Sequence, residues 1–102
     1  MERLEDEVLA DGEKLAYTIE ALPKCLIRAE SAIAMKDDVA TKSYLGAVRF
    51  NWGILCELTK KYPNSELIRR EVKEARKYAK GILPRKVYRE IYEKEYVESE
   101  DE

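Results

Sequence analysis

The stretch Val39–Tyr62, VATKSYLGAVRFNWGILCELTKKY, decides the fold of this chain. It holds the only Trp and the only Phe of the sequence. Wound as a helix of about 3.6 residues per turn, it carries apolar side chains over roughly two-thirds of its circumference. Val48 and Leu55 lie at the centre of this apolar surface, with Phe50 on one side and Trp52 on the other. Because such a helix must be covered on several sides, we expect it to be the central helix of an all-α fold.

A second apolar stripe precedes the central segment and predicts a long helix that begins at about Glu13. Its members recur at alternating steps of four and three residues: Leu15, Ile19, Leu22, Leu26, Ala29 and Ile33. Asp11–Gly12 predicts a break between this helix and a short helical turn over residues 2–11. Pro23 interrupts the stripe without shifting its phase, so we expect a kink there, a stop and restart being the alternative.

Short polar segments mark the ends of the other helices. Asp38 is the expected N-cap of the central helix. The Pro-Asn-Ser sequence at 63–65 ends that helix and supplies Asn64 or Ser65 as the N-cap of the next one. Gly81 is the expected C-terminal cap of this third helix.

These signals predict a small antiparallel helical bundle of three to four helices with a long central helix. The third helix is expected over Glu66–Lys80 and the fourth from Pro84 to about Val97. Residues 1–97 form a single helical domain in this interpretation, and residues 98–102 form an acidic tail. The core is expected to come from residues 15–33, 44–62 and 68–79.

Composition limits the class of protein. Charged residues make up 39% of the chain, Gln is absent and Asn occurs only at positions 51 and 64. Such a bias is typical of proteins from high-temperature sources, which favour charge networks and avoid labile amides. No uncharged run approaches the roughly 20 residues of a membrane span, and the N-terminus is acidic rather than signal-like. We expect a cytoplasmic protein without a membrane association, whose two cysteines are small core residues rather than a disulfide.

The sequence offers few groups for catalysis. The chain has no His, which removes the usual general base and the common nucleophile–base pairs. We therefore expect a protein that is not an enzyme and has no cofactor or metal. The alternative is the pair Glu71-x-x-Glu74 and Glu98-x-x-Asp101, whose spacing resembles the magnesium-binding motif of all-α nucleotide pyrophosphohydrolases. Such a site needs four converging carboxylates, and a Glu-rich chain also produces this spacing by chance.

Two segments carry a family resemblance. Ala40-x-x-x-Tyr44-x-x-Ala47 resembles the small–aromatic–small spacing in the second helix of tetratricopeptide repeats. The segment LTKKYPNSELIRREVKEARKYA, residues 58–79, is similar to the turn and following helix that join successive repeats. The Trp-x-x-Leu-Gly-x-x-Tyr pattern of the family's first helix is missing. The resemblance implies a scaffold that binds other proteins in a concave groove, and a generic helical bundle is the alternative.

Positive charge is concentrated in one segment. Residues 60–89 contain eleven Lys or Arg and three Glu, whereas the whole chain has a net charge of −2. On the third helix, one line of basic residues, the basic ridge, consists of Arg69, Lys73, Arg76 and Lys80. Such a ridge is suited to phosphates or to an acidic protein surface. The alternative is a solvated helix face that pairs with the acidic ends of the chain.

The narrow polar strip of the central helix predicts a partner contact. We call this strip the outer strip, and it consists of Lys42, Gly46, Arg49, Gly53 and Glu57. Each glycine costs about 0.5–1 kcal/mol relative to Ala inside a helix. Close approach of another backbone, either the fourth helix or a second protomer, would explain why both are present, and chance is the alternative. We expect a non-enzymatic protein–protein interaction and assembly module, in particular a homo-oligomer. The alternative is a small nucleic-acid-associated protein that uses residues 60–89.

Overall fold

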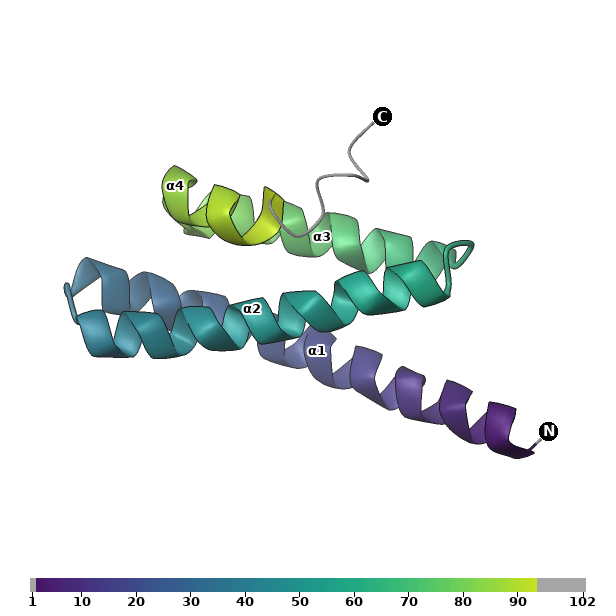
Figure 1. Cartoon of the computed structure of the whole chain (residues 1–102). Helices are drawn as coiled ribbons and strands as arrows, with labels where there is room; N and C mark the ends of the chain where they lie inside the picture. The colour runs from purple at the N-terminus through teal and green to yellow at the C-terminus, as the bar shows by residue number, and fades with distance from the viewer. Residues whose placement is uncertain (1, 94–102) are drawn as a thin grey trace.

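The chain folds into packed helices in a computed structural model that describes the backbone of residues 2–93 and the side chains of residues 6–93 (Figure 1). The elements in chain order are α1 (Glu2–Ala34), α2 (Asp38–Lys61), α3 (Glu66–Ile82), α4 (Arg85–Tyr88) and the π-helix η1 (Arg89–Glu93). No strand occurs among residues 2–93. The all-α prediction is confirmed.

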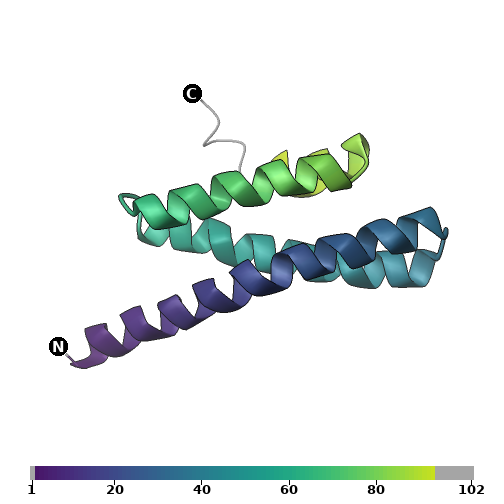
Figure 2. The same ribbon diagram turned by 180° about the vertical axis from the view of Figure 1, so that it is seen from behind.

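The helices pack as an antiparallel series. α1 and α2 form a hairpin, α3 returns across both, and α4 with η1 turns back alongside α3 (Figures 1 and 2). α1 and α3 therefore run in the same direction. The turn between α1 and α2 places Lys36 at φ 57°, and the N–H of Asp37 bonds to the carbonyl of Ala32 at 3.0 Å. This is the hydrogen bond of a Schellman cap, with lysine where glycine is usual.

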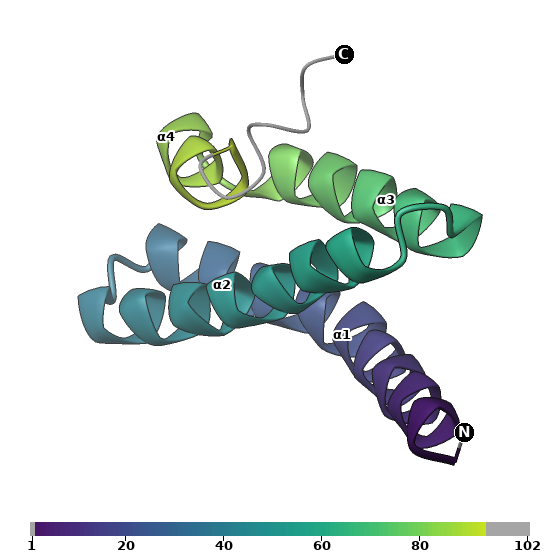
Figure 3. The same ribbon diagram turned by 45° about the vertical axis from the view of Figure 1, so that its right-hand side comes forward.

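α1 is longer than the sequence predicts. It is continuous through Asp11–Gly12 and through Pro23, so the predicted break is wrong. Asp11 is 7% exposed and binds the end of α2, and this tertiary contact outweighs the roughly 1 kcal/mol cost of a helical glycine. Figures 1 and 3 show that the axis of α1 changes direction along its length, as expected for a helix that is kinked rather than stopped by proline.

Two predicted caps differ by small shifts. The N-cap of α2 is Asp37, whose side chain accepts a hydrogen bond from the N–H of Ala40 at 3.1 Å, so the assignment to Asp38 is wrong by one residue. Ser65, one of the two predicted candidates, caps α3 by accepting a hydrogen bond from the N–H of Ile68. Gly81 lies inside α3, and the C-cap is Leu83 in an extended conformation. Because Pro84 favours an extended residue before it, α3 ends without a left-handed glycine.

The core has an aliphatic part and an aromatic part. Side chains of α1, α2 and α3 make the first, with Leu26 and Val48 both at 0% exposure. Trp52 and Tyr92 make the second, with ring centroids 4.5 Å apart, and Tyr88 stacks on Tyr92 at 5.1 Å. The predicted core included Trp52 but stopped at residue 79, so Tyr88 and Tyr92 were left out of it. Phe50 is 65% exposed, and its assignment to the apolar surface that packs inside is wrong.

One polar pair lies inside the hairpin. Thr18 is 0% and Asn51 2% exposed. Thr18 Oγ1 donates to Asn51 Oδ1 at 3.4 Å, and Asn51 Nδ2 donates to the carbonyl of Ala47 at 2.9 Å. Since a buried polar group without a partner is costly, the pair favours one register of α1 against α2.

Candidate functional site

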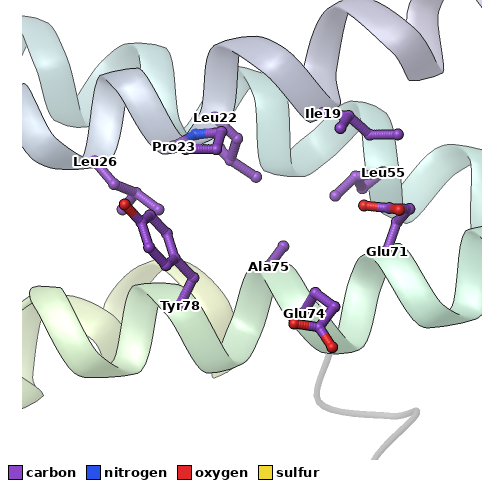
Figure 4. Close-up of a pocket in the computed structure, with 9 residues that line it drawn as sticks. All are labelled: Ile19, Leu22, Pro23, Leu26, Leu55, Glu71, Glu74, Ala75 and Tyr78. Carbon is purple, nitrogen blue, oxygen red and sulfur yellow. The ribbon is translucent and has the colours of Figure 1, made fainter.

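A groove runs between α1 and α3, with α2 as its floor (Figure 4). α1 contributes Ile19, Leu22, Pro23 and Leu26, α2 contributes Leu55, and α3 contributes Glu71, Glu74, Ala75 and Tyr78. The groove has a volume of 380 Å³, within the range of about 300–1,000 Å³ that is usual for ligand sites. Its floor is aliphatic and buried, and its walls are partly exposed. This geometry suits apolar side chains of a bound molecule.

The charged groups at the groove are carboxylates, and the hydroxyl of Tyr78 can donate or accept a hydrogen bond. Glu71 extends from α3 towards Ile19 and Leu55, whereas Glu74 lies on the outer edge of α3 (Figure 4). Neither carboxylate forms an ion pair with a residue whose side chain the structure describes. Pro23 has no N–H and cannot donate to the carbonyl of Ile19 one turn earlier. The groove therefore combines an apolar floor with an acceptor-rich, negatively charged wall.

The outer strip lies on the side of α2 that faces away from the core. Lys42, Arg49 and Glu57 are exposed, Gly46 is exposed and Gly53 is half-buried. A side-chain carbon added at either glycine would meet no described atom within 4 Å. No neighbouring group among the described residues therefore lies close enough to explain the glycines.

An open depression of 620 Å³ follows the first half of the outer strip. Lys42, Gly46 and Arg49 line it together with Leu45 and other residues of α2. Apolar side chains also surround the strip, because Val39 is 80% exposed and Phe50 is 65% exposed. The predicted partner-binding residues thus lie on one accessible, partly apolar helix face.

The outer strip has a mirror symmetry along the chain. Lys42 and Glu57 are equally far from the midpoint between Arg49 and Phe50, and so are Gly46 and Gly53. In an antiparallel pair of identical helices, residues equally far from the midpoint lie at the same height. If two copies of the strip paired antiparallel about this midpoint, lysine would lie opposite glutamate, glycine opposite glycine and Arg49 opposite Phe50.

The basic ridge lies on the flank of α3 opposite the groove. Arg69 donates from Nη2 to the carbonyl of Pro63 at 3.1 Å, so part of the ridge holds the turn between α2 and α3. Lys73 and Lys80 are exposed, and Arg76 is half-buried. Phosphate binding by this ridge stays a prediction.

The tyrosines near the basic ridge have other roles. Tyr88 and Tyr92 are 5% and 0% exposed, so their rings pack in the core and cannot stack on nucleic-acid bases. Tyr96 lies outside the described residues. The i, i+4 spacing of Tyr88 and Tyr92 therefore serves packing within the fold.

A charged cluster fastens the N-terminal part of α1 to the end of α2. Asp11 Oδ2 accepts hydrogen bonds from Tyr62 Oη at 2.6 Å and from Lys61 Nζ at 2.8 Å. Lys61 also pairs with Glu7. The bonds from Lys61 and Tyr62 lower the pKa of Asp11 below its usual 3.8. The bond to Asp11 raises the pKa of Tyr62.

This cluster predicts a pH-dependent contribution to stability. Since the pKa of Asp11 is lower in the folded protein than the unfolded value of 3.8, its contribution is present above that value and is lost as the pH falls through the folded value. We expect Asp11→Asn to be less stable than wild type at pH 7. The difference in unfolding free energy between the two proteins should vanish at the acidic end of the range, about pH 2. Urea unfolding of both proteins between pH 2 and 7 measures this, with Asp6→Asn at an exposed site as the control. A difference independent of pH would contradict the assignment.

The structure also bears on the carboxylate motif, the cysteines and the membrane-span prediction. Glu98 and Asp101 lie outside the described residues, so the four-carboxylate motif is not brought together here. Within the described part, no group of three or more acidic or cysteine side chains is placed to hold a metal ion. Cys25 is half-buried and Cys56 is buried, and the two cysteines do not form a disulfide with each other. None of the described helices has the length and apolar character that crossing a membrane requires.

The groove was not predicted, because it depends on how α1 crosses α3. In the sequence, the available signal was that Glu71, Glu74 and Tyr78 share one flank of the third helix. Ile19 was predicted to face inward with the apolar stripe, but it is 37% exposed. The tetratricopeptide resemblance, the thermophilic origin and the cytoplasmic location stay predictions. Comparison of the chain with models of known protein families, with curated proteins and with solved structures gave no match.

Proposed function

We propose that this chain is a non-enzymatic assembly module that forms an antiparallel homodimer through the outer strip of α2. The observation that supports this proposal is the mirror symmetry of the strip on an exposed helix face. A two-fold dimer interface must be self-complementary, because residue i contacts j and j contacts i. In the proposed dimer, Lys42 faces Glu57 of the partner subunit at both ends of the strip. Gly46 faces Gly53 of the partner subunit on both sides of the centre, so the strip is complementary to itself.

The contacts divide into a central part and two ends. At the centre, the guanidinium of Arg49 lies over the ring of Phe50 of the partner subunit, a cation–π contact of about 0.5–1 kcal/mol at an exposed site. The glycines on either side let the backbones approach closely. At each end, Lys42 pairs with Glu57 of the partner subunit. The strip spans about 22 Å, at 1.5 Å per residue.

The interface is small, which sets the expected affinity. One pair of helices buries an area at or below the low end of specific interfaces, about 1,200 Å² in total. Trp52 is buried within a single chain and adds nothing to the contact. We expect a dissociation constant in the micromolar range, which corresponds to about 8 kcal/mol.

The nucleic-acid alternative has less support. Tyr88 and Tyr92 are buried, and Arg69 is bonded to the backbone of Pro63. The two tyrosine rings are therefore not accessible for base stacking, and the Arg69 end of the ridge holds a turn of the fold. Titration with DNA or RNA at two salt concentrations distinguishes the two functions, because binding through phosphates weakens steeply with salt.

Replacing a glycine of the outer strip tests the proposed dimer. We expect Gly46→Leu to abolish dimerisation in sedimentation equilibrium, because its side chain fills the space needed by the second helix. The same variant should be more stable as a monomer, by roughly 0.5–1 kcal/mol, because leucine is the better helix former. Wild type should show a concentration-dependent monomer–dimer equilibrium.

Gly12→Leu is the matched control for this substitution. Gly12 is an exposed glycine of α1 with the same open surroundings, so the variant should gain similar stability and dimerise like wild type. A wild-type protein that stays monomeric at millimolar concentration would overturn the proposal. So would a Gly46→Leu variant that dimerises normally.

A further inference from the structure

We propose that the groove between α1 and α3 binds an amphipathic helix of a partner protein that carries Arg or Lys beside its apolar face. The groove lies on the core side of α2, with Leu55 in its floor, whereas the outer strip lies on the opposite side. This proposal is therefore independent of the homodimer, and a dimer formed through the outer strips leaves both grooves open.

The extent of the apolar surface fits a helix. Beyond the two ends of the groove, Leu67 on α3 is 47% exposed and Ile27 on α1 is 50% exposed. Since α1 and α3 run in the same direction, Leu67 lies at the Ile19 end and Ile27 at the Tyr78 end. Measured along the helix axes from Leu67 at one end to the level of Ile27 at the other, the apolar surface spans some 12 residues, or about 18 Å at 1.5 Å per residue. A helix that docks in a groove uses apolar anchors at i, i+3 or i+4 and i+7, which this length accommodates.

The charge of the groove selects the partner. Its wall presents the carboxylate of Glu71, and Glu74 lies at its outer edge (Figure 4). Neither carboxylate has an ionic partner among the described side chains. Arg or Lys on the bound helix supplies the missing charge, and charge complementarity of this kind governs specificity and association rate.

Segments of the chain itself do not match the groove. Residues 94–102, KEYVESEDE, carry five acidic residues and one Lys, so Glu71 and Glu74 would repel them. The basic helix of this chain, α3, already uses its apolar side for the core. The occupant is therefore a basic amphipathic helix of another protein.

A designed peptide tests this inference on the full chain. The probe is a fluorescein-labelled helical peptide of about 16 residues, with leucines at i, i+4, i+7 and i+11 and arginines on both flanks. A second peptide carries glutamates in place of the arginines. We expect the arginine peptide to bind at least tenfold more tightly than the glutamate peptide at low salt, measured by fluorescence anisotropy.

Two variants locate the binding. The double variant Glu71→Lys/Glu74→Lys should weaken binding of the arginine peptide at least tenfold, whereas Glu90→Lys, at an exposed position of η1, should bind like wild type. Methyl NMR should show shifts at Ile19, Leu26 and Leu55 of the wild-type protein. The inference fails if the arginine peptide does not bind, if the two peptides bind equally, or if the shifts map to the outer strip. It also fails if the double variant, shown by circular dichroism to be folded, binds like wild type.

Discussion

A Trp52→Ala variant is expected to lose about 3–5 kcal/mol of unfolding free energy, as is typical when a large aromatic side chain is removed from a core. Trp52 is 0% exposed and its ring packs against Tyr92 at 4.5 Å between centroids. Its removal leaves a cavity between α2 and η1, and the ring of Tyr92, which stacks on Tyr88, loses its contact with Trp52. Urea unfolding followed by far-UV circular dichroism measures the loss.

Phe50→Ala is the matched control for this prediction. Phe50 is two residues away on the same helix, but its side chain is 65% exposed. We expect the monomer of this variant to change by less than about 0.5 kcal/mol, as for most surface substitutions. Equal losses for the two variants would show that the placement of α2 described here is wrong.

Reversing one charge of the outer strip is expected to weaken the proposed homodimer by about 10- to 100-fold at low salt. In Lys42→Glu, the new carboxylate faces Glu57 of the partner subunit at both ends of the contact. Two attractive pairs are each replaced by a repulsive one, and like charges that face each other across an interface are strongly unfavourable. Glu57→Lys should have the same effect. Sedimentation equilibrium measures both, and Lys80→Glu, outside the strip, is the control.

Much of the fold could be predicted because it depends on periodicity within one helix. The central helix, Val39–Tyr62, matches α2 at Asp38–Lys61 almost to the residue, and Val48 and Leu55 are buried as expected. Ser65 was predictable as a cap, since its preference is local. The break at Asp11–Gly12 was wrong, because contacts of Asp11 with Lys61 and Tyr62 keep the helix continuous.

The rest depends on which helices meet. Phe50 and Trp52 are both aromatic and both adjoin the apolar line of α2, and the sequence does not reveal that η1 covers only Trp52. The groove likewise arises from the crossing of α1 and α3, which helical periodicity does not determine. The outer strip and the basic ridge could be proposed from the sequence because each lies along one face of a single helix, and both stay predictions.

The two proposals give the module a simple arrangement. A dimer formed through the outer strips places two grooves on its outer sides, since the groove and the strip lie on opposite sides of α2. Such a dimer would hold two basic partner helices at a fixed separation. A partner with two such helices would bind more tightly than one with a single helix. Once its first helix is bound, its second helix meets the other groove at a high effective concentration.

The mixing of two charge-reversed variants tests the antiparallel homodimer most directly. Lys42→Glu and Glu57→Lys are each expected to be monomeric alone at low salt. Mixed in equal amounts, they should form a one-to-one heterodimer in native mass spectrometry, because both ends of the contact then pair opposite charges. The double variant Lys42→Glu/Glu57→Lys should dimerise with itself like wild type. If the mixture stays monomeric while wild type dimerises, the outer strip does not pair in the antiparallel arrangement proposed here.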